Sequence, residues 1–170
     1  AWIMTIHAFC NKVLKRERLT IARDFKVDTN FTIIEQSEAR ELQYEVAKKI
    51  VTTDYVQKNE SSSSGDQLYE QLTQKEIIDT IIALADKARV YDVEITNIIA
   101  SDKNGQPKLT HEKNAEYVNK RIADLTRSYV CAYQAEKAQQ GYLDVSDQIL
   151  FTKRLFESHP NIAQSYKDQF

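Results

Sequence analysis

Polar side chains that could contact a ligand lie near both ends of the chain. Thr5 and His7 stand where a short apolar segment turns into a helical pattern, so a hydroxyl and an imidazole are available there. Asp144 and Asp147 follow Gly141 at a second turn of this kind. Each set also has a purely structural interpretation, because His7 can cap or pack its turn and Asp144 can cap the helix that follows it.

Other kinds of site find no support in the sequence. The loop that cradles nucleotide phosphates needs G-x-x-x-x-G-K-[ST], and none of Gly65, Gly105 and Gly141 stands in that motif. His111-Glu112 begins like a zinc-binding helix, but no second His follows at the required spacing. Neither G-x-S-x-G nor a Cys/His pairing is visible. The sequence therefore predicts no catalytic residue, no metal site and no cofactor bound by this chain itself.

The composition favours helix over sheet. The 170 residues are 42% apolar and 28% charged, with three Gly and two Pro, whereas multi-stranded folds need more turn residues. The net charge is −2, so no overall field attracts the chain to nucleic acid. Charge is uneven, however, because residues 11–26 hold six basic and two acidic side chains and residues 60–94 hold eight acidic and three basic ones. We expect a mainly α fold, an irregular helical bundle with one short N-terminal extended segment.

The two cysteines bear on the compartment of the protein. Cys10 and Cys131 lie far apart, without C-x-x-C or metal-ligand spacing, which is typical of buried, reduced thiols in a cytosolic protein. The start of the chain lacks the basic residues of a signal peptide, and no run of about 18 apolar residues could span a membrane. We therefore expect a cytoplasmic protein with no membrane partner.

A long amphipathic helix forms the predicted centre of the fold. No Gly or Pro interrupts the chain from Glu116 to Gly141, and Gly141 stands where a left-handed residue would end the helix. Lys120, Arg121 and Arg127 are expected on its solvated outer face. The apolar positions recur every three or four residues, as on one face of a helix, and are Val118, Ile122, Leu125, Tyr129, Ala132, Tyr133 and Ala135.

Helices and short connections alternate before this central helix. Residues 1–6 predict a short strand leading into a helix with a basic end, and residues 19–32 predict an irregular stretch. Residues 31–34 predict a brief extended piece, after which Ser37 can cap a helix. The apolar stripe of that helix is Ala39, Leu42, Val46, Ala47 and Ile50.

Polar segments separate the predicted helices in the middle of the chain. Four Ser and a Gly within residues 58–66 predict a flexible loop. Thr73 can cap the next helix, whose wide apolar face suits a buried position. Residues 93–99 predict a shorter helix that ends in a turn over residues 100–105, and Thr110 can cap the central helix.

Both ends of the chain resemble superfamily 1 DNA helicases of the UvrD/Rep/PcrA type, and an AddA/RecB-like helicase is an alternative within that group. Residues 5–10 read Thr-Ile-His-Ala-Phe-Cys, similar to the family's Thr-x-His-(Ser/Ala)-Phe-Cys. Residues 143–148 read Leu-Asp-Val-Ser-Asp-Gln, where the family usually has Leu-Asp-Phe-Asp-Asp-Leu. Residues 155–170 follow the family's Leu-Leu…Pro…Tyr…Phe run. The departures in the acidic segment are Val145, Ser146 and Gln148.

The resemblance implies a domain organisation. Residues 1–18 and 141–170 would be strips of motor domain 1A, and residues 19–140 would be the helical 1B subdomain that emerges from it. The parent protein would use ATP and Mg²⁺ to translocate on single-stranded DNA and to unwind duplex. Its partners would be single-stranded and duplex DNA and the remaining helicase domains 1A, 2A and 2B. If both ends belong to one motor domain, the helix after Thr5 should pack against the helix after Asp144.

The resemblance also implies roles for individual residues. Thr5 and His7 match the motif beside the single-stranded DNA track, and the acidic turn with Asp144 and Asp147 packs near the motor core. Lys103 is a further candidate for DNA contact, although its Asp-Lys-Asn-Gly segment is also explained as a turn. The basic residues that could contact the DNA backbone without reading sequence are Lys12, Lys15, Arg16 and Arg18. The alternative function is a helical protein–protein interaction module without catalytic activity.

Overall fold

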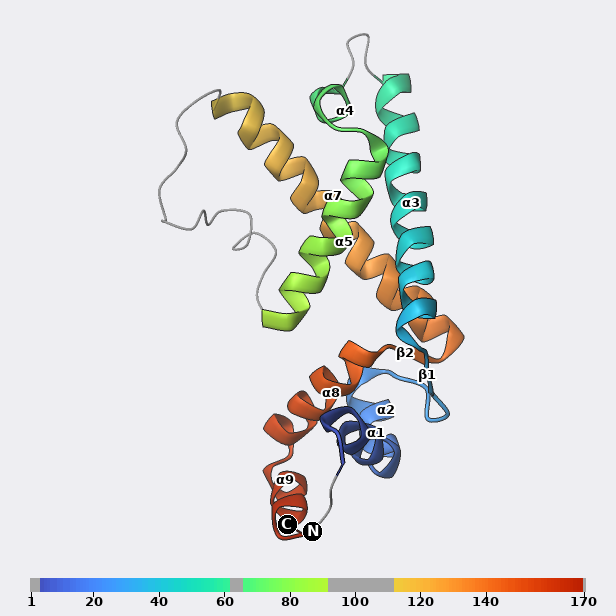
Figure 1. Ribbon diagram of the computed structural model, residues 1–170, viewed down its shortest axis with the longest axis vertical. Coiled ribbons are helices and arrows are strands. Elements are labelled where there is room, and N and C mark those ends of the chain that lie inside the picture. The colour runs from blue at the N-terminus through green and yellow to red at the C-terminus, as the bar shows by residue number, and fades with distance from the viewer. Residues whose placement is uncertain (1–3, 62–65, 92–111, 170) are drawn as a thin grey trace. The chain divides into compact units, whose positions relative to one another are not determined.

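The computed structural model describes residues 4–61, 66–91 and 112–169. Over these residues the chain forms eight helices and one two-stranded parallel sheet, so the expectation of a mainly α fold is confirmed (Figure 1). The chain divides into two compact units, which are described separately. Unit 1 comprises Ala1–Ala39 and Ala135–Phe170, and unit 2 comprises Arg40–Gln134.

The first helix of unit 1, α1 (Ile6–Arg16), is capped by Thr5 and not by His7, which lies inside the helix. Thr5 has extended backbone, with φ −69° and ψ 157°, and its Oγ1 accepts a hydrogen bond from the Ala8 N–H at 3.2 Å. This contact satisfies one of the free N–H groups at the helix start. Residues 1–3 of the strand predicted over residues 1–6 lie outside the described residues. Residues 4–6 form no strand, because Thr5 is the cap of α1 and Ile6 its first residue, so that part of the prediction was wrong.

A second helix, α2 (Arg18–Phe25), occupies part of the stretch expected to be irregular, so that prediction was wrong. No side chain caps its start, and it ends at Lys26, whose φ of 54° is left-handed. Ile21, the buried residue of this helix, supplies its packing. Burial of an apolar face therefore stabilises α2 without the capping signals that sequence patterns rely on.

The second half of unit 1 begins with the last turn of the long helix α7 (Glu112–Gln140). Gly141 ends this helix with φ +67°, as expected. The strand β2 (Tyr142–Leu143) then pairs in parallel with β1 (Thr32–Ile33), in the register Thr32↔Tyr142 and Ile33↔Leu143. The extended piece predicted around residues 31–34 is thus confirmed.

Two helices complete unit 1. Asp144 caps α8 (Val145–Ser158), and Pro160 opens α9 (Pro160–Lys167) at a position where its missing N–H costs nothing. Helix α1 packs against α8, as expected from the resemblance (Figure 1). The buried residues of the shared core are Val13, Leu14, Ile21, Leu143, Phe151, Leu155 and Tyr166.

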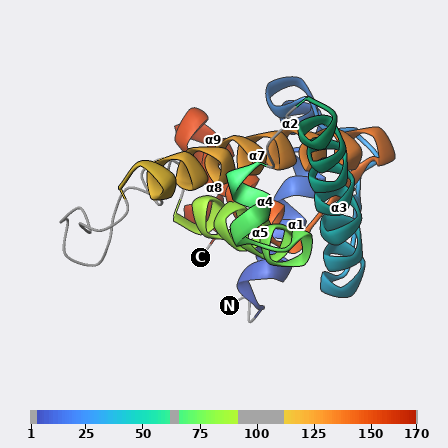
Figure 2. The same ribbon diagram turned by 90° about the horizontal axis from the view of Figure 1, so that it is seen from above.

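Unit 2 contains most of α3 (Gln36–Ser61) and α7, together with α4 (Gln67–Gln71) and α5 (Gln74–Tyr91). Helices α5 and α7 cross in Figure 1 and lie side by side in Figure 2. Both contribute residues to the core of the unit. The buried residues of this core are Ala47, Val51, Leu68, Ile77, Ile78, Ile81, Ala85, Ile122, Leu125, Tyr129 and Tyr133.

The boundaries of α3 differ from the expected ones. Ser37 was predicted as the cap but lies inside the helix, because the helix starts at Gln36: the Ala39 N–H donates to the Glu35 carbonyl at 2.9 Å. At the other end, residues 58–61 were assigned to a loop but form the last turn of the helix. Residues 62–65 of that loop lie outside the described residues.

The start of α5 is capped as predicted. Thr73 Oγ1 accepts the Glu76 N–H at 3.2 Å, and Glu76 Oε2 accepts the Thr73 N–H at 2.8 Å, which is a reciprocal capping box. The helix predicted over residues 93–99, the turn over 100–105 and the cap at Thr110 lie outside the described residues.

The cysteines differ from each other in exposure. Cys10 is buried in unit 1 as expected, whereas Cys131 is exposed, so its predicted burial was wrong. Cys131 stands two residues from both Tyr129 and Tyr133, which face the core, and a step of two residues points a helical side chain away from that face. None of the helices within the described ranges is long and apolar enough to cross a membrane.

Candidate functional site

The predicted DNA-contact residues at the head of the chain gather on α1. Thr5, His7, Lys12, Lys15 and Arg16 are all exposed. The opposite side of the helix is anchored in the core of unit 1 by its buried residues Cys10, Val13 and Leu14. Lys12, Lys15 and Arg16 therefore lie on the side of the helix away from the core, whereas His7 stands at helical spacing from Cys10 and Leu14 and is exposed in the first turn. The last member of the predicted set, Lys103, lies outside the described residues.

Arg16 is held at the end of α1 by an aromatic neighbour. Its guanidinium carbon lies 5.4 Å from the centroid of the Tyr166 ring, within the range of a cation–π contact. The Tyr166 hydroxyl donates to Glu17 Oε1 at 3.2 Å. Burial and the negative charge of Glu17 raise the pKa of Tyr166 to about 12. Arg16 remains more than half exposed, with 56% of its side chain accessible.

The acidic turn at the tail of the chain closes on itself as a capping box. Asp144 Oδ1 accepts the Asp147 N–H, and Asp147 Oδ2 accepts the Asp144 N–H, both at 2.9 Å. Both residues are buried. The structural interpretation of Asp144 as a helix cap is therefore correct, and any role in packing near a motor core stays a prediction.

A buried lysine that the sequence analysis missed completes this turn. Lys137, on the last turns of α7, places its Nζ 2.9 Å from Asp144 Oδ2 and 2.6 Å from Asp147 Oδ2. Its side chain is 2% exposed. The signal in the sequence was its position four residues after Tyr133, where the buried stripe of α7 continues. We call Lys137, Asp144 and Asp147 the lysine clamp.

Electrostatics make the lysine clamp sensitive to the loss of its cation. The two carboxylates need compensation because charges held away from water are costly when unpaired. Removing one partner of a buried ion pair typically costs about 3–5 kcal/mol, far more than an exposed pair contributes. Lys137 therefore fixes the first turn of α8 beside the last turn of α7.

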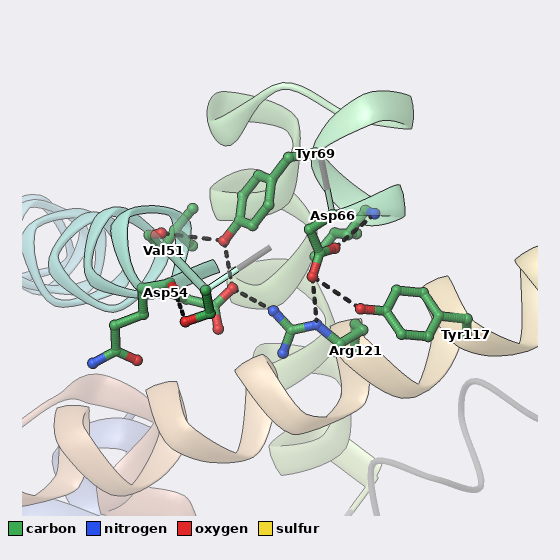
Figure 3. A network of polar contacts seen from close by, with 9 residues as sticks. Val51, Asp54, Asp66, Tyr69, Tyr117 and Arg121 are labelled. Carbon is green, nitrogen blue, oxygen red and sulfur yellow. Dashed lines mark hydrogen bonds and ion pairs between the residues drawn. The ribbon is translucent and has the colours of Figure 1, made fainter. Parts of the chain in front are cut away.

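A second polar network lies inside unit 2 and joins three helices (Figure 3). Arg121 of α7 forms an ion pair with Asp54 of α3, and its Nε lies 3.7 Å from Asp66 Oδ2 at the start of α4. Tyr69 donates to Asp54 Oδ2 at 2.6 Å, and Tyr117 donates to Asp66 Oδ2 at 2.9 Å. We call these five residues the arginine network.

The arginine network corrects the expectation that Arg121 decorates an outer face. Its side chain is 14% exposed, because α3 and α4 bring two carboxylates to that side of α7. The other two basic residues behave as predicted: Lys120 is exposed, and Arg127 forms a partly exposed pair with Asp124 at 3.0 Å.

The protonation states of the arginine network follow from its packing. Burial alone would lower the pKa of Arg121, but the hydrogen bond and charge of Asp54, with the charge of Asp66, outweigh it and raise that pKa. Burial, and then the hydrogen bond to Asp54, raise the pKa of Tyr69. Burial and the hydrogen bond to Asp66 raise the pKa of Tyr117. All three groups therefore keep their protons at neutral pH, and the network is built to bind helices together.

A third polar contact ties α2 to the junction of α8 and α9 in unit 1. His159 Nε2 lies 2.6 Å from Asp24 Oδ2, and Arg23 donates to Asp24 Oδ1 at 2.8 Å. The hydrogen bonds from Arg23 and then from His159 lower the pKa of Asp24. Asp24 is thereby favoured as an acceptor for both neighbours.

The described residues offer no set of side chains that fits ATP or Mg²⁺. The sequence lacks the phosphate-binding motif, and the described residues contain no group of three or more His, Cys, Asp or Glu side chains that could hold a metal ion. The acids at the tail are engaged by Lys137 and by backbone N–H groups. No chemical step on a nucleotide is therefore assigned to these residues.

The fold and its polar sites define a helical, scaffold-like piece with a basic exposed helix. The family described as UvrD/REP helicase N-terminal domain matches residues 1–170. The chain therefore belongs to the UvrD/REP helicase N-terminal domain family. No curated protein and no solved structure matches it significantly.

Proposed function

We propose that this chain guides DNA beside the motor of an ATP-dependent helicase that translocates on single-stranded DNA and unwinds duplex. The observation that carries the proposal is that α1 and its cap expose both residues of the family's Thr-x-His motif and three basic side chains. Such side chains can bind phosphates without reading sequence. The residues proposed for DNA contact are Thr5, His7, Lys12, Lys15, Arg16 and Lys103.

Within that proposal, unit 1 corresponds to strips of motor domain 1A and unit 2 to most of the 1B subdomain. The packing of α1 against α8 supports this assignment, because it joins the head of the chain to its tail. The units divide at residues 39/40 and 134/135, so residues 19–39 group with the head, whereas the family resemblance suggested limits at 18/19 and 140/141.

The surface of unit 1 supports the remaining helicase domains 1A, 2A and 2B as partners. Ile6 is 58% exposed, and Leu19 is 72% exposed. Ile6 continues the buried stripe of Cys10 and Val13 at helical spacing, so the apolar face of α1 extends beyond the core of the unit. ATP and Mg²⁺ would be bound by those other domains in a cytoplasmic enzyme.

Salt-dependent binding of fluorescent single-stranded DNA tests the proposal. Each phosphate contact to a single strand contributes about 0.7 to the slope of log K against log salt. A variant with Lys12, Lys15 and Arg16 all changed to Gln should lose about 2 from that slope if all three make contacts. The matched control changes exposed lysines of α3, as Lys48→Gln and Lys49→Gln, and should keep the slope. An equal loss in both variants would contradict a specific role for α1.

The protein–protein interaction module remains the second candidate, and one observation favours it. Tyr44, Tyr55 and Val56 of α3 in unit 2 are exposed, and Tyr44 and Tyr55 stand eleven residues apart, close to three helical turns. An interaction module would show no salt-dependent DNA binding in the same assay. It would instead lose partner binding when Tyr44 and Tyr55 are changed to Ser.

A further inference from the structure

We propose that Lys137 is a positioning residue for DNA binding by α1, because it fixes the first turn of α8, the helix against which α1 packs. The inference rests on the proposed function, since it takes α1 as the helix that contacts DNA. Lys137 itself is buried and would touch no nucleic acid.

The lysine clamp exceeds what a helix cap requires. A capping box needs only two side chains and two backbone N–H groups, and Asp144 and Asp147 supply both halves of it. Lys137 adds a buried ammonium to the same carboxylates, and Asp147 Oδ2 accepts from both the Asp144 N–H and Lys137 Nζ. The extra contact joins the last turn of α7 to the first turn of α8.

A second anchor holds the segment between these helices. The Thr32 N–H donates to the Gly141 carbonyl at 2.8 Å, and the Ile34 N–H donates to the Leu143 carbonyl at 2.9 Å. Leu143 is buried directly before the cap residue Asp144. The start of α8 is thus fixed from two directions, by β1 and by Lys137.

The position of α8 then determines that of α1. Phe151 and Leu155 of α8 share one core with Val13 and Leu14 of α1. Close-packed interiors transmit displacements because they contain few voids to absorb them. A displacement of the first turn of α8 would therefore move the exposed basic side of α1.

The test compares salt slopes of single-stranded DNA binding in folded variants of this chain. Lys137→Met removes the ammonium that Asp144 and Asp147 share, so this variant can simply unfold. The triple variant Lys137→Met, Asp144→Asn, Asp147→Asn removes all three charges, and the asparagine that it places at the cap position is also a good cap residue. Its folding is checked by circular dichroism. The matched control, Lys120→Met, removes one charge from an exposed position of α7.

We expect the folded triple variant to lose at least about 0.7 from the salt slope, equivalent to one phosphate contact, while Lys120→Met keeps the slope of the unmodified chain. Amide hydrogen exchange in the first turn of α8 should also be faster in the triple variant. A folded triple variant with an unchanged slope would overturn the positioning role and leave Lys137 as a purely stabilising residue. Absence of salt-dependent binding in the unmodified chain would instead reject the proposed function, and the positioning role with it.

Discussion

Arg121 of α7 and Asp54 of α3 form an ion pair inside unit 2, with 14% and 16% of their side chains exposed. The two residues are far apart in sequence, and each stands at helical spacing from the apolar stripe of its own helix, Arg121 three residues after Val118 and Asp54 four residues after Ile50. Their contact, with Tyr69 and Asp66, makes one polar network of three helices (Figure 3). Because the carboxylates are shielded from water, the network depends on its single guanidinium.

Replacing Arg121 should therefore be costly. Arg121→Met leaves Asp54 and Asp66 without their cation, and we expect the free energy of unfolding to fall by about 3 kcal/mol in urea denaturation. Arg127→Met, on the same helix, breaks a pair whose partners are 43% and 51% exposed, and should change stability by less than about 0.5 kcal/mol. Similar small losses in both variants would mean that the arginine network contributes no more than a surface pair.

Removing the N-cap of α5 should lower the stability of the chain by a moderate amount. Thr73→Ala removes the oxygen that accepts the Glu76 N–H, and we expect a loss of about 1 kcal/mol. Thr73→Ser keeps that oxygen and should retain most of the stability. Urea denaturation of the two variants measures the difference, and equal losses would show that the methyl group rather than the cap matters.

Local signals explain what could be predicted from the sequence. The caps at Thr73 and Asp144 and the left-handed Gly141 each depend on residues within one helical turn, so their patterns were sufficient. The long helix α7 also followed directly from its apolar period.

Contacts between distant segments explain what could not be predicted. Arg121 and Lys137 stand at helical spacing from the buried stripe of α7, but a charged side chain is expected in solvent unless its partners from other elements are known. Helix α2 lacks a side-chain cap and is stabilised by packing of Ile21, which no local pattern encodes. The errors therefore concentrate where tertiary contacts override local preference.

The contact between Asp24 and His159 should make the stability of the chain depend on pH in the acidic range. The pKa of Asp24 is lowered in the folded state, so its contribution to stability is present above the unfolded value of about 3.9 and is lost as the pH falls through the lowered value. Asp24→Asn should therefore destabilise the chain at neutral pH, and the difference should vanish in acid. Urea denaturation across pH measures it, with Asp79→Asn at an exposed position as the control. If Asp24→Asn still destabilises the chain at a pH below the lowered pKa of Asp24, the destabilisation does not come from the charge of Asp24.

The contribution of Tyr166 to stability depends on pH in the opposite sense, because it is lost in the alkaline range. Burial and Glu17 raise its pKa to about 12, whereas an unfolded tyrosine ionises near about 10. Its contribution to stability is therefore complete below about pH 10 and is lost as the pH rises through 12.

Glu17→Gln removes the negative charge beside the hydroxyl and should lower the pKa of Tyr166, which the ultraviolet absorbance of tyrosinate measures. The assignment is made with Tyr166→Phe, which should remove this late ionisation, and the exposed change Glu41→Gln should leave it in place. If Glu17→Gln does not advance the ionisation, burial alone accounts for the raised pKa.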